Sequence, residues 1–335
     1  MFTRLSLLAL ALGSTALPVL AEEVNIYSHR QPELIQPLID AFTAETGIDV
    51  NIAFVDKGMA ERLVAEGKRS PADLVLTVDI ARLAQIVDAG VTQAVDSAVL
   101  QANIPANLRD PANQWFGLTS RARIVYAAKD RVSPDEITTY EDLADPKWKG
   151  RICTRSGTND YNVALMAAVI AHRGEAAAKT WALGLKANLA RRPAGGDRDQ
   201  VKAIWAGECD IAIGNTYYIG QMLADPDQKA WAESVQVLFP TFEGDGTHLN
   251  VSGMAMTKAA PNYDAALKMM EWLSGDKAQK IYAETNYEFP VKPGVERSAL
   301  VKSWGNFIPD SLNLTDVAKQ RPAALRIMEE IDFDG

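Results

Sequence analysis

The amino-acid sequence predicts an α/β protein made of two lobes with a ligand cleft between them. Strand-like apolar runs alternate with helical segments in the N-terminal part of the chain, a rhythm typical of sheets covered by helices. Extended segments at 115–128 and at 235–239 with 249–256 have the character of strands that connect two lobes. The chain has 335 residues, which exceeds what one hydrophobic core usually supports.

Local signals then place the individual elements. Pro32 suits the first turn of a helix that Gly47 ends. In a largely parallel sheet we expect strands and helices to alternate over residues 24–27, 32–46, 48–55, 58–66, 73–77 and 80–88. Further helices are predicted over 140–143, 161–172, 175–189, 197–206, 263–274 and 278–285, with a helical tail from about 314. We expect an N-terminal lobe of residues 22–122 and 247–297, and a C-terminal lobe of residues 123–246 and 298–335.

Residues 1–21 have the pattern of a secretory signal peptide. Arg4 supplies a basic start, residues 5–12 are apolar, and the small residue Ala21 precedes Glu22. The apolar stretch is too short for a membrane-spanning helix. We therefore expect an exported protein in a bacterial periplasm, without membrane insertion.

Composition excludes several classes of function. The 43 acidic residues outnumber the 34 basic ones, giving a net charge of −9, which argues against nucleic acid or an anionic membrane as partner. The chain has only three histidines and neither a Gly-x-Ser-x-Gly nor a His-Glu-x-x-His motif. We therefore expect a binding protein rather than an enzyme.

Three tyrosines occur in matching sequence contexts. Tyr217 and Tyr218 follow the segment 210–216, whose short apolar run breaks at Gly214 and Asn215, and Tyr161 follows the segment 151–160. Each segment has the pattern of a strand, a turn and the start of a helix. Because open α/β sheets bind ligands at the carboxyl ends of their strands, the tyrosines are candidates for one site.

Phenolate oxygen is a hard anionic ligand, so converging tyrosines indicate a hard, highly charged cation, above all Fe(III). A single tyrosine is more simply explained as an amphipathic packing residue with its hydroxyl in water. The parallel placement of Tyr161 and the pair Tyr217 and Tyr218 favours the metal interpretation.

Three phenolates would leave open coordination positions on a ferric ion, and an anion there needs cationic anchors. Arg121, Arg123 and Arg30 are the candidates, because a guanidinium group matches the geometry of carbonate or carboxylate. Arg121 and Arg123 face the same side of one predicted strand. The alternative is that these arginines form ion pairs at the surface or between lobes.

The two cysteines, Cys153 and Cys209, each stand eight residues before a tyrosine of the candidate site. At matching positions in an oxidising compartment we expect them to form a disulfide. A thiolate metal site is disfavoured because it would have only two ligands and no nearby histidine.

The chain resembles the periplasmic ferric-iron-binding proteins of ABC transporters, which have a type II periplasmic-binding fold. The tyrosine motifs are the specific part of this resemblance. The matching segments span nearly the whole chain after the leader, at residues 25–30, 72–79, 117–123, 156–162, 214–218, 246–253 and 286–290.

The resemblance implies ferric-iron ligation by Tyr161, Tyr217 and Tyr218, and delivery of the ion to an inner-membrane ABC permease by a monomeric protein. Some relatives add a His and a Tyr from an Arg-His-Tyr sequence, where this chain has 30–32, Arg-Gln-Pro. Carbonate, another synergistic anion or water is then expected to complete the coordination. His29, in the same turn, is either an additional ligand or a solvent-exposed residue.

A second hypothesis stays open on the same scaffold. The cleft could bind an organic anion such as a sulfonate, a phosphonate or a sugar acid, with tyrosines donating hydrogen bonds and arginines holding the charge. Colour distinguishes the two, since only tyrosine–iron(III) coordination gives a charge-transfer band.

Overall fold

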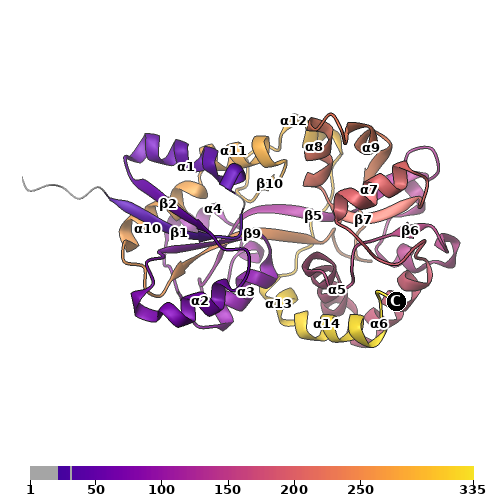
Figure 1. The fold of residues 1–335 in the computed structure, drawn as a ribbon, viewed down its shortest axis with the longest axis horizontal. Coiled ribbons are helices and arrows are strands. Elements are labelled where there is room, and N and C mark those ends of the chain that lie inside the picture. Colours follow the sequence, from indigo (N-terminus) through magenta and orange to yellow (C-terminus); the bar gives the residue numbers. More distant parts are fainter. Residues whose placement is uncertain (1–21, 31) are drawn as a thin grey trace, which may run out of the picture.

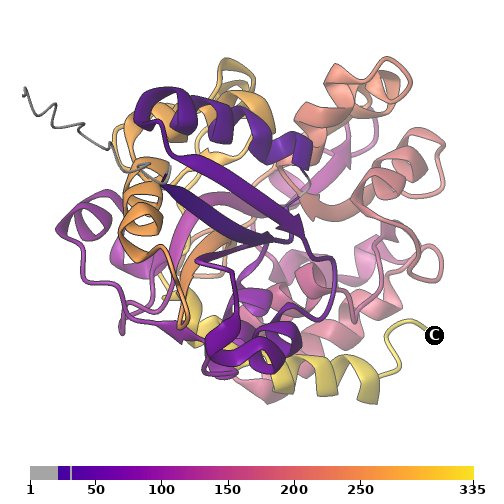
Figure 2. The ribbon, with the colours of Figure 1, turned by 60° about the vertical axis from the view of Figure 1, so that its left-hand side comes forward.

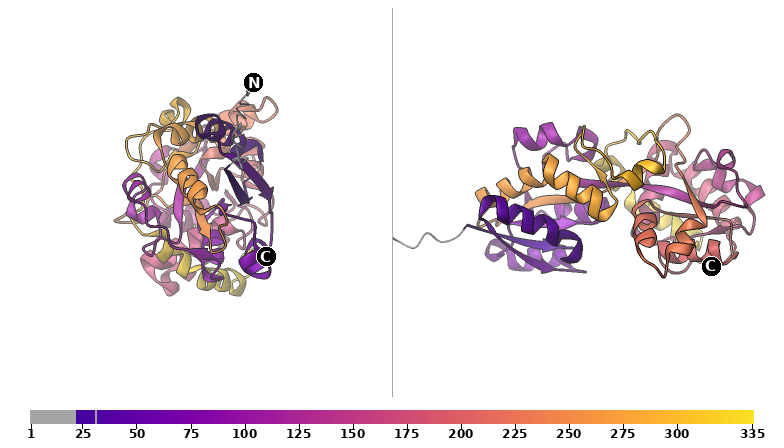
Figure 3. Two further views of the ribbon diagram at one scale, coloured as in Figure 1. Left: turned by 90° about the vertical axis from the view of Figure 1, so that its left-hand side faces the viewer. Right: turned by 90° about the horizontal axis from the view of Figure 1, so that it is seen from above.

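The computed structural model describes residues 22–30 and 32–335, so the predicted signal peptide lies outside the described residues. Two lobes lie side by side along the long axis of the molecule (Figure 1). Strands at the centre of the picture run from one lobe into the other, and the view from above shows the same two bodies joined at their middle (Figure 3). The two-lobed α/β prediction is confirmed.

The N-terminal segment forms the expected alternation of strands and helices. Its elements are β1 (Glu23–Ser28), α1 (Pro32–Thr46), β2 (Asp49–Phe54), α2 (Met59–Glu66), β3 (Leu74–Thr77), α3 (Ile80–Asp88), β4 (Thr92–Gln93) and α4 (Ala98–Asn103). In Figure 1, α1 lies above the strands of this lobe and α2 and α3 lie below them; Figure 2 shows the same layers from another side.

The chain then crosses to the second lobe through β5 (Phe116–Ala128) and later returns through β9 (Leu249–Thr257). Every residue of both strands is buried, as expected for strands covered on both faces. Between them lie β6 (Ile152–Cys153), α5 (Asp160–Arg173), α6 (Glu175–Ala187), α7 (Asp197–Trp205), β7 (Ile211–Asn215), α8 (Tyr217–Ala224), α9 (Lys229–Glu233) and β8 (Val235–Leu238). The helix expected at 140–143 is a short 3₁₀ turn, Glu141–Ala144.

The last segment contributes to both lobes. Its elements are α10 (Tyr263–Leu273), α11 (Asp276–Asn286), β10 (Phe289–Pro290), α12 (Ala299–Ser303), α13 (Leu314–Lys319) and α14 (Arg321–Glu330). Helices α10 and α11 contact α1, whereas α13 and α14 pack against α5. Helix α13 also contacts α3, so the C-terminal tail touches both lobes.

The sheet runs in the order β2-β1-β3-β9-β5-β7-β6. Strand β5 pairs with β9 up to Ala122 and with β7 from Arg123 onward. The expectation of a largely parallel sheet is wrong at its centre, because β3 with β9, β9 with β5, and β5 with β7 are antiparallel. A strand that crosses between lobes and a neighbouring strand that returns necessarily run in opposite directions.

The predicted disulfide is present between Cys153 and Cys209, whose Cα atoms are 5.9 Å apart. It joins β6 to the segment that enters β7. The disulfide thus ties together the segments that lead to Tyr161 and to Tyr217. None of the helices in residues 22–30 and 32–335 combines the length and apolar character needed to cross a bilayer.

Candidate metal centre

The three predicted tyrosines come together between the lobes. The Tyr217 hydroxyl donates to the Tyr161 hydroxyl at 3.3 Å, and the rings of Tyr217 and Tyr218 lie 4.3 Å apart between centroids. All three line a hollow of about 270 Å³. Its other lining residues come from both lobes and include His29, Arg30, Arg121, Arg198, Gln221 and Glu288.

Two helix starts bring these phenols together. Asn159 caps α5 by accepting a hydrogen bond from the backbone N–H of Tyr161 at 3.1 Å, which fixes the second residue of that helix. Strand β7 ends two residues before Tyr217. Gly214 is required there because a Cβ atom would lie 2.1 Å from the ring of Tyr126. β5 and β7 therefore approach each other closely two residues before the turn residue Thr216, where α8 is about to begin.

Burial makes the phenols of Tyr217 and Tyr218 harder to ionise. It is the largest cause that raises the pKa of Tyr217 well above the ordinary value of 10, and the neighbouring Tyr161 raises it further. Burial and Tyr161 also raise the pKa of Tyr218. A bound cation must therefore displace these protons, as metal ions do from water and thiols.

On one side of the tyrosines, Arg30 and Arg121 share the carboxylate of Glu288. Arg30 Nη2 lies 3.1 Å from Glu288 Oε2, and Arg121 contacts the other oxygen. Arg121 Nη2 also donates to the hydroxyl of Ser252 at 2.6 Å. Although burial raises the pKa of Glu288, the charges of Arg30 and Arg121 lower it to about 2. Glu288 is therefore ionised, and this Arg–Glu–Arg cluster carries one net positive charge.

Sequence reasoning did not assign Glu288 to the site. It lies in the segment 286–290 that carries part of the family resemblance, directly before the short strand β10. A carboxylate beside a buried strand was the available signal. The signal was insufficient because its two arginine partners lie far away in the sequence, 258 and 167 residues distant.

On the other side, Arg123 is not among the residues that line the hollow and is buried against Asp197. Its Nη1 lies 2.7 Å from Asp197 Oδ2, and Arg155 Nη1 lies 3.2 Å from Asp197 Oδ1. The guanidinium carbons of Arg123 and Arg155 are 5.8 and 5.3 Å from the ring centre of Tyr161. The three predicted anion anchors therefore separate into two groups.

His29 borders the tyrosine hollow and also a neighbouring hollow of about 270 Å³. It is half-buried, and its Nδ1 has no hydrogen-bond partner among the described residues. Burial, followed by the charge of Arg82, lowers its pKa to about 4. The ring is neutral at neutral pH, which is the form that binds metals.

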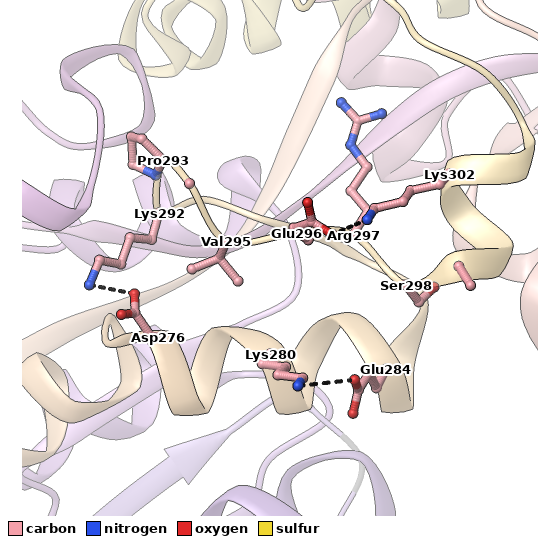
Figure 4. A pocket seen from close by; sticks show the side chains of 12 residues that line it. Asp276, Lys280, Glu284, Lys292, Pro293, Val295, Glu296, Arg297, Ser298 and Lys302 are labelled. Atoms are coloured by element: carbon pink, nitrogen blue, oxygen red, sulfur yellow. Dashed lines mark hydrogen bonds and ion pairs between the residues drawn. The ribbon is translucent and has the colours of Figure 1, made fainter.

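Two other features of the described residues lie away from the tyrosines. The hollow in Figure 4, about 740 Å³, lies between α11 and the segment 292–302. Its charges pair with one another, as in Lys292 with Asp276 at 2.6 Å. At the far end of α5, the two ring nitrogens of His172 face Asp310 at 2.9 Å and Asp245 at 3.3 Å. None of the residues named for these two features lines the tyrosine hollow.

The fold and the site together define a two-lobed binding protein with a tyrosine-lined cleft. The chain belongs to the family of bacterial extracellular solute-binding proteins, whose sequence profile matches residues 28–280.

Similar proteins narrow this class. The chain is 45% identical over 315 residues to iron uptake protein A1 of Synechocystis sp., covering 92% of this chain and 87% of that protein. The open crystal structure of Mannheimia haemolytica ferric iron-binding protein A superposes with a TM-score of 0.90 at 53% identity, covering 94% and 100% of the two chains. A Trichodesmium protein solved with iron and citrate gives 0.89 at 42% identity, covering 93% and 99%. The predicted resemblance to ferric-iron-binding proteins is confirmed.

Proposed function

We propose that this protein binds ferric iron through Tyr161, Tyr217 and Tyr218 in the periplasm and delivers it to an inner-membrane ABC permease. The observation that carries the proposal is the meeting of phenols from two separate helix starts in one interlobe hollow. Relatives named for iron uptake and ferric-iron binding support it. The protein acts as a carrier without catalysis, and we expect a monomer.

Three phenolates neutralise a trivalent ion and leave coordination positions open. We propose that carbonate or another synergistic anion occupies some of these positions. Arg121 and Arg30 support this role because both line the hollow and their shared carboxylate cancels only one of their two charges. Arg123, predicted for the same role, forms a buried ion pair with Asp197 and does not line the hollow. His29 is a candidate for a further position.

Delivery requires that the lobes open and close. We propose that they divide as the sequence predicts, into residues 22–122 with 247–297 and residues 123–246 with 298–335. The change of partner of β5 after Ala122 supports a hinge at this point. Hinge closure around a ligand is the usual movement of two-lobed binding proteins.

The test is a titration of the purified protein with ferric citrate or ferric nitrilotriacetate. We expect a visible charge-transfer band, one iron per chain and an increase in the unfolding temperature. The relatives do not favour the organic-anion alternative. A colourless protein that is stabilised by a sulfonate, a phosphonate or a sugar acid, and not by ferric iron, would restore it.

A further inference from the structure

Asp197 is a buried carboxylate that the proposed iron site does not use directly. It begins α7, and its side chain is 0% exposed. Its Oδ2 accepts hydrogen bonds from Arg123 Nη1 at 2.7 Å and from the backbone N–H of Asn215 at 2.8 Å. Its Oδ1 accepts from Arg155 Nη1 at 3.2 Å. Asp197 thus joins α7, β5, β7 and the loop before α5.

The partners of Asp197 lead to both tyrosine-bearing segments. Arg123 Nη2 donates to Asn162 Oδ1 at 2.7 Å, and Asn162 directly follows Tyr161. Arg123 Nη1 also lies 3.2 Å from Asn215 Oδ1, and Asn215 stands two residues before Tyr217. One carboxylate therefore holds, directly or through Arg123, a neighbour of each helix start.

Asn162 transmits this constraint to the loop before Tyr161. Its amide nitrogen donates to Thr154 Oγ1 at 3.1 Å, to the carbonyl of Arg155 at 2.9 Å and to the carbonyl of Ser156 at 3.1 Å. The turn that starts α5 is thereby tied to the same network as the turn that starts α8.

Charge and burial make the network intolerant of partial loss. The side chains of Arg123 and Asp197 are 2% and 0% exposed. Removing one member of a buried pair leaves an uncompensated charge, which is strongly destabilising. Because Asn162 and Asn215 hydrogen-bond to this pair, we expect its loss to change where the tyrosine hydroxyls lie.

We propose that Asp197 is a positioning residue for the ferric ion: it holds the start of α5 and the start of α8 in the register in which the hydroxyls of Tyr161, Tyr217 and Tyr218 converge. The inference rests on the proposed iron binding. Asp197 itself does not contact the metal in this role.

The test compares Asp197→Asn with Asp210→Asn in the full-length mature protein. Asp210 is a control in the same lobe because it also bridges two arginines, Arg131 and Arg151, each at 2.6 Å; its side chain is 18% exposed, whereas that of Asp197 is 0% exposed. It lies just before the start of β7, whereas Asn215 is the last residue of that strand. Both variants lose one bridging charge, but only Asp197→Asn loosens the tyrosine-bearing turns.

For Asp197→Asn we expect a loss of ferric affinity of about 10–100-fold, the range typical of residues that orient metal ligands, with a displaced charge-transfer maximum. For Asp210→Asn we expect affinity within about threefold of wild type and an unchanged band, because distant sites act independently. Affinity is measured by competition with nitrilotriacetate, and thermal unfolding of the iron-free proteins reports their stability. If Asp197→Asn does not fold, Asn162→Ala tests the same link with the buried ion pair kept, with an expected loss of about tenfold.

Three outcomes distinguish the positioning role of Asp197 from the proposed iron binding. Wild-type affinity and band position in Asp197→Asn overturn the positioning role while the iron-carrier proposal stands. Equal losses in the Asp197 and Asp210 variants also overturn it, because they indicate a general effect of lobe stability. A wild-type protein that binds no ferric iron overturns the proposed function itself.

Discussion

Two arginine–carboxylate clusters flank the tyrosines, and they differ in what they face. Arg30, Arg121 and Glu288 line the interlobe hollow, whereas Arg123 and Asp197 are buried behind the tyrosines, with Arg155 at their edge. Each cluster combines two guanidinium groups with one carboxylate. The same chemistry therefore occurs in two settings: one cluster faces the hollow, and the other hydrogen-bonds to the turns that begin α5 and α8.

The largest expected loss of ferric affinity follows substitution of the tyrosines that lie between the two clusters. Tyr217→Phe removes a phenolate and should reduce ferric affinity by more than about 100-fold. Loss of a residue that only orients a metal ligand costs up to about that much. It should also abolish most of the charge-transfer absorbance. Tyr263→Phe, in α10 of the other lobe, is the control. Unchanged iron binding in both Tyr217→Phe and Tyr218→Phe would remove the site assignment.

Acidification should also weaken iron binding strongly. The pKa values of Tyr217 and Tyr218 are raised above 10, so both groups are protonated at neutral pH and metal binding releases their protons. Ferric affinity should fall by about tenfold per pH unit for each phenolate that coordinates. Competition titrations at several pH values against a chelator of known proton dependence measure this slope. A slope of zero would contradict phenolate ligation.

Glu288→Gln tests the cluster that faces the ligand. It leaves Arg30 and Arg121 buried with two uncompensated charges and should lower the unfolding free energy by about 3 kcal/mol. Because the pKa of Glu288 is depressed to about 2, its stabilisation is present above the unfolded-state value of about 4.3 and is lost as pH falls toward 2. Glu284→Gln, an exposed pair with Lys280, should change stability by less than about 0.5 kcal/mol. Denaturant unfolding of both variants measures these changes. Equal stability of Glu288→Gln and the wild-type protein would show that the two arginines need no counter-charge.

The smallest expected effect is that of His29→Ala. A neutral imidazole adds no charge to the ferric ion, so we expect a loss of about tenfold, the lower end of the range for residues that orient metal ligands. If His29 contacts the metal, the charge-transfer band of His29→Ala should be displaced, whereas that of His172→Ala, at the far end of α5, should not. Spectra and affinities identical to those of the wild-type protein would assign His29 to the wall of the hollow alone.

Local sequence signals predicted the elements that carry the site. Pro32 and Gly47 marked α1, whose bounds the structure reproduces. The matching strand–turn–helix patterns placed Tyr161 and Tyr217 at helix starts, and the equal spacing of the cysteines predicted the disulfide. These features depend on neighbours a few residues away, so the sequence is enough to recognise them.

By itself the sequence determined the α/β class, the two crossings and the tyrosine-bearing turns, because periodicity, capping and turn chemistry are local. Only the tertiary structure decided the antiparallel centre of the sheet and the partners of each arginine. Arg121 and Arg123 are two residues apart on one strand, yet they pair with carboxylates 167 and 74 residues away. The physical reason is that a buried guanidinium must be neutralised by a carboxylate that folding brings within hydrogen-bond distance, and sequence separation does not reveal which carboxylate that is.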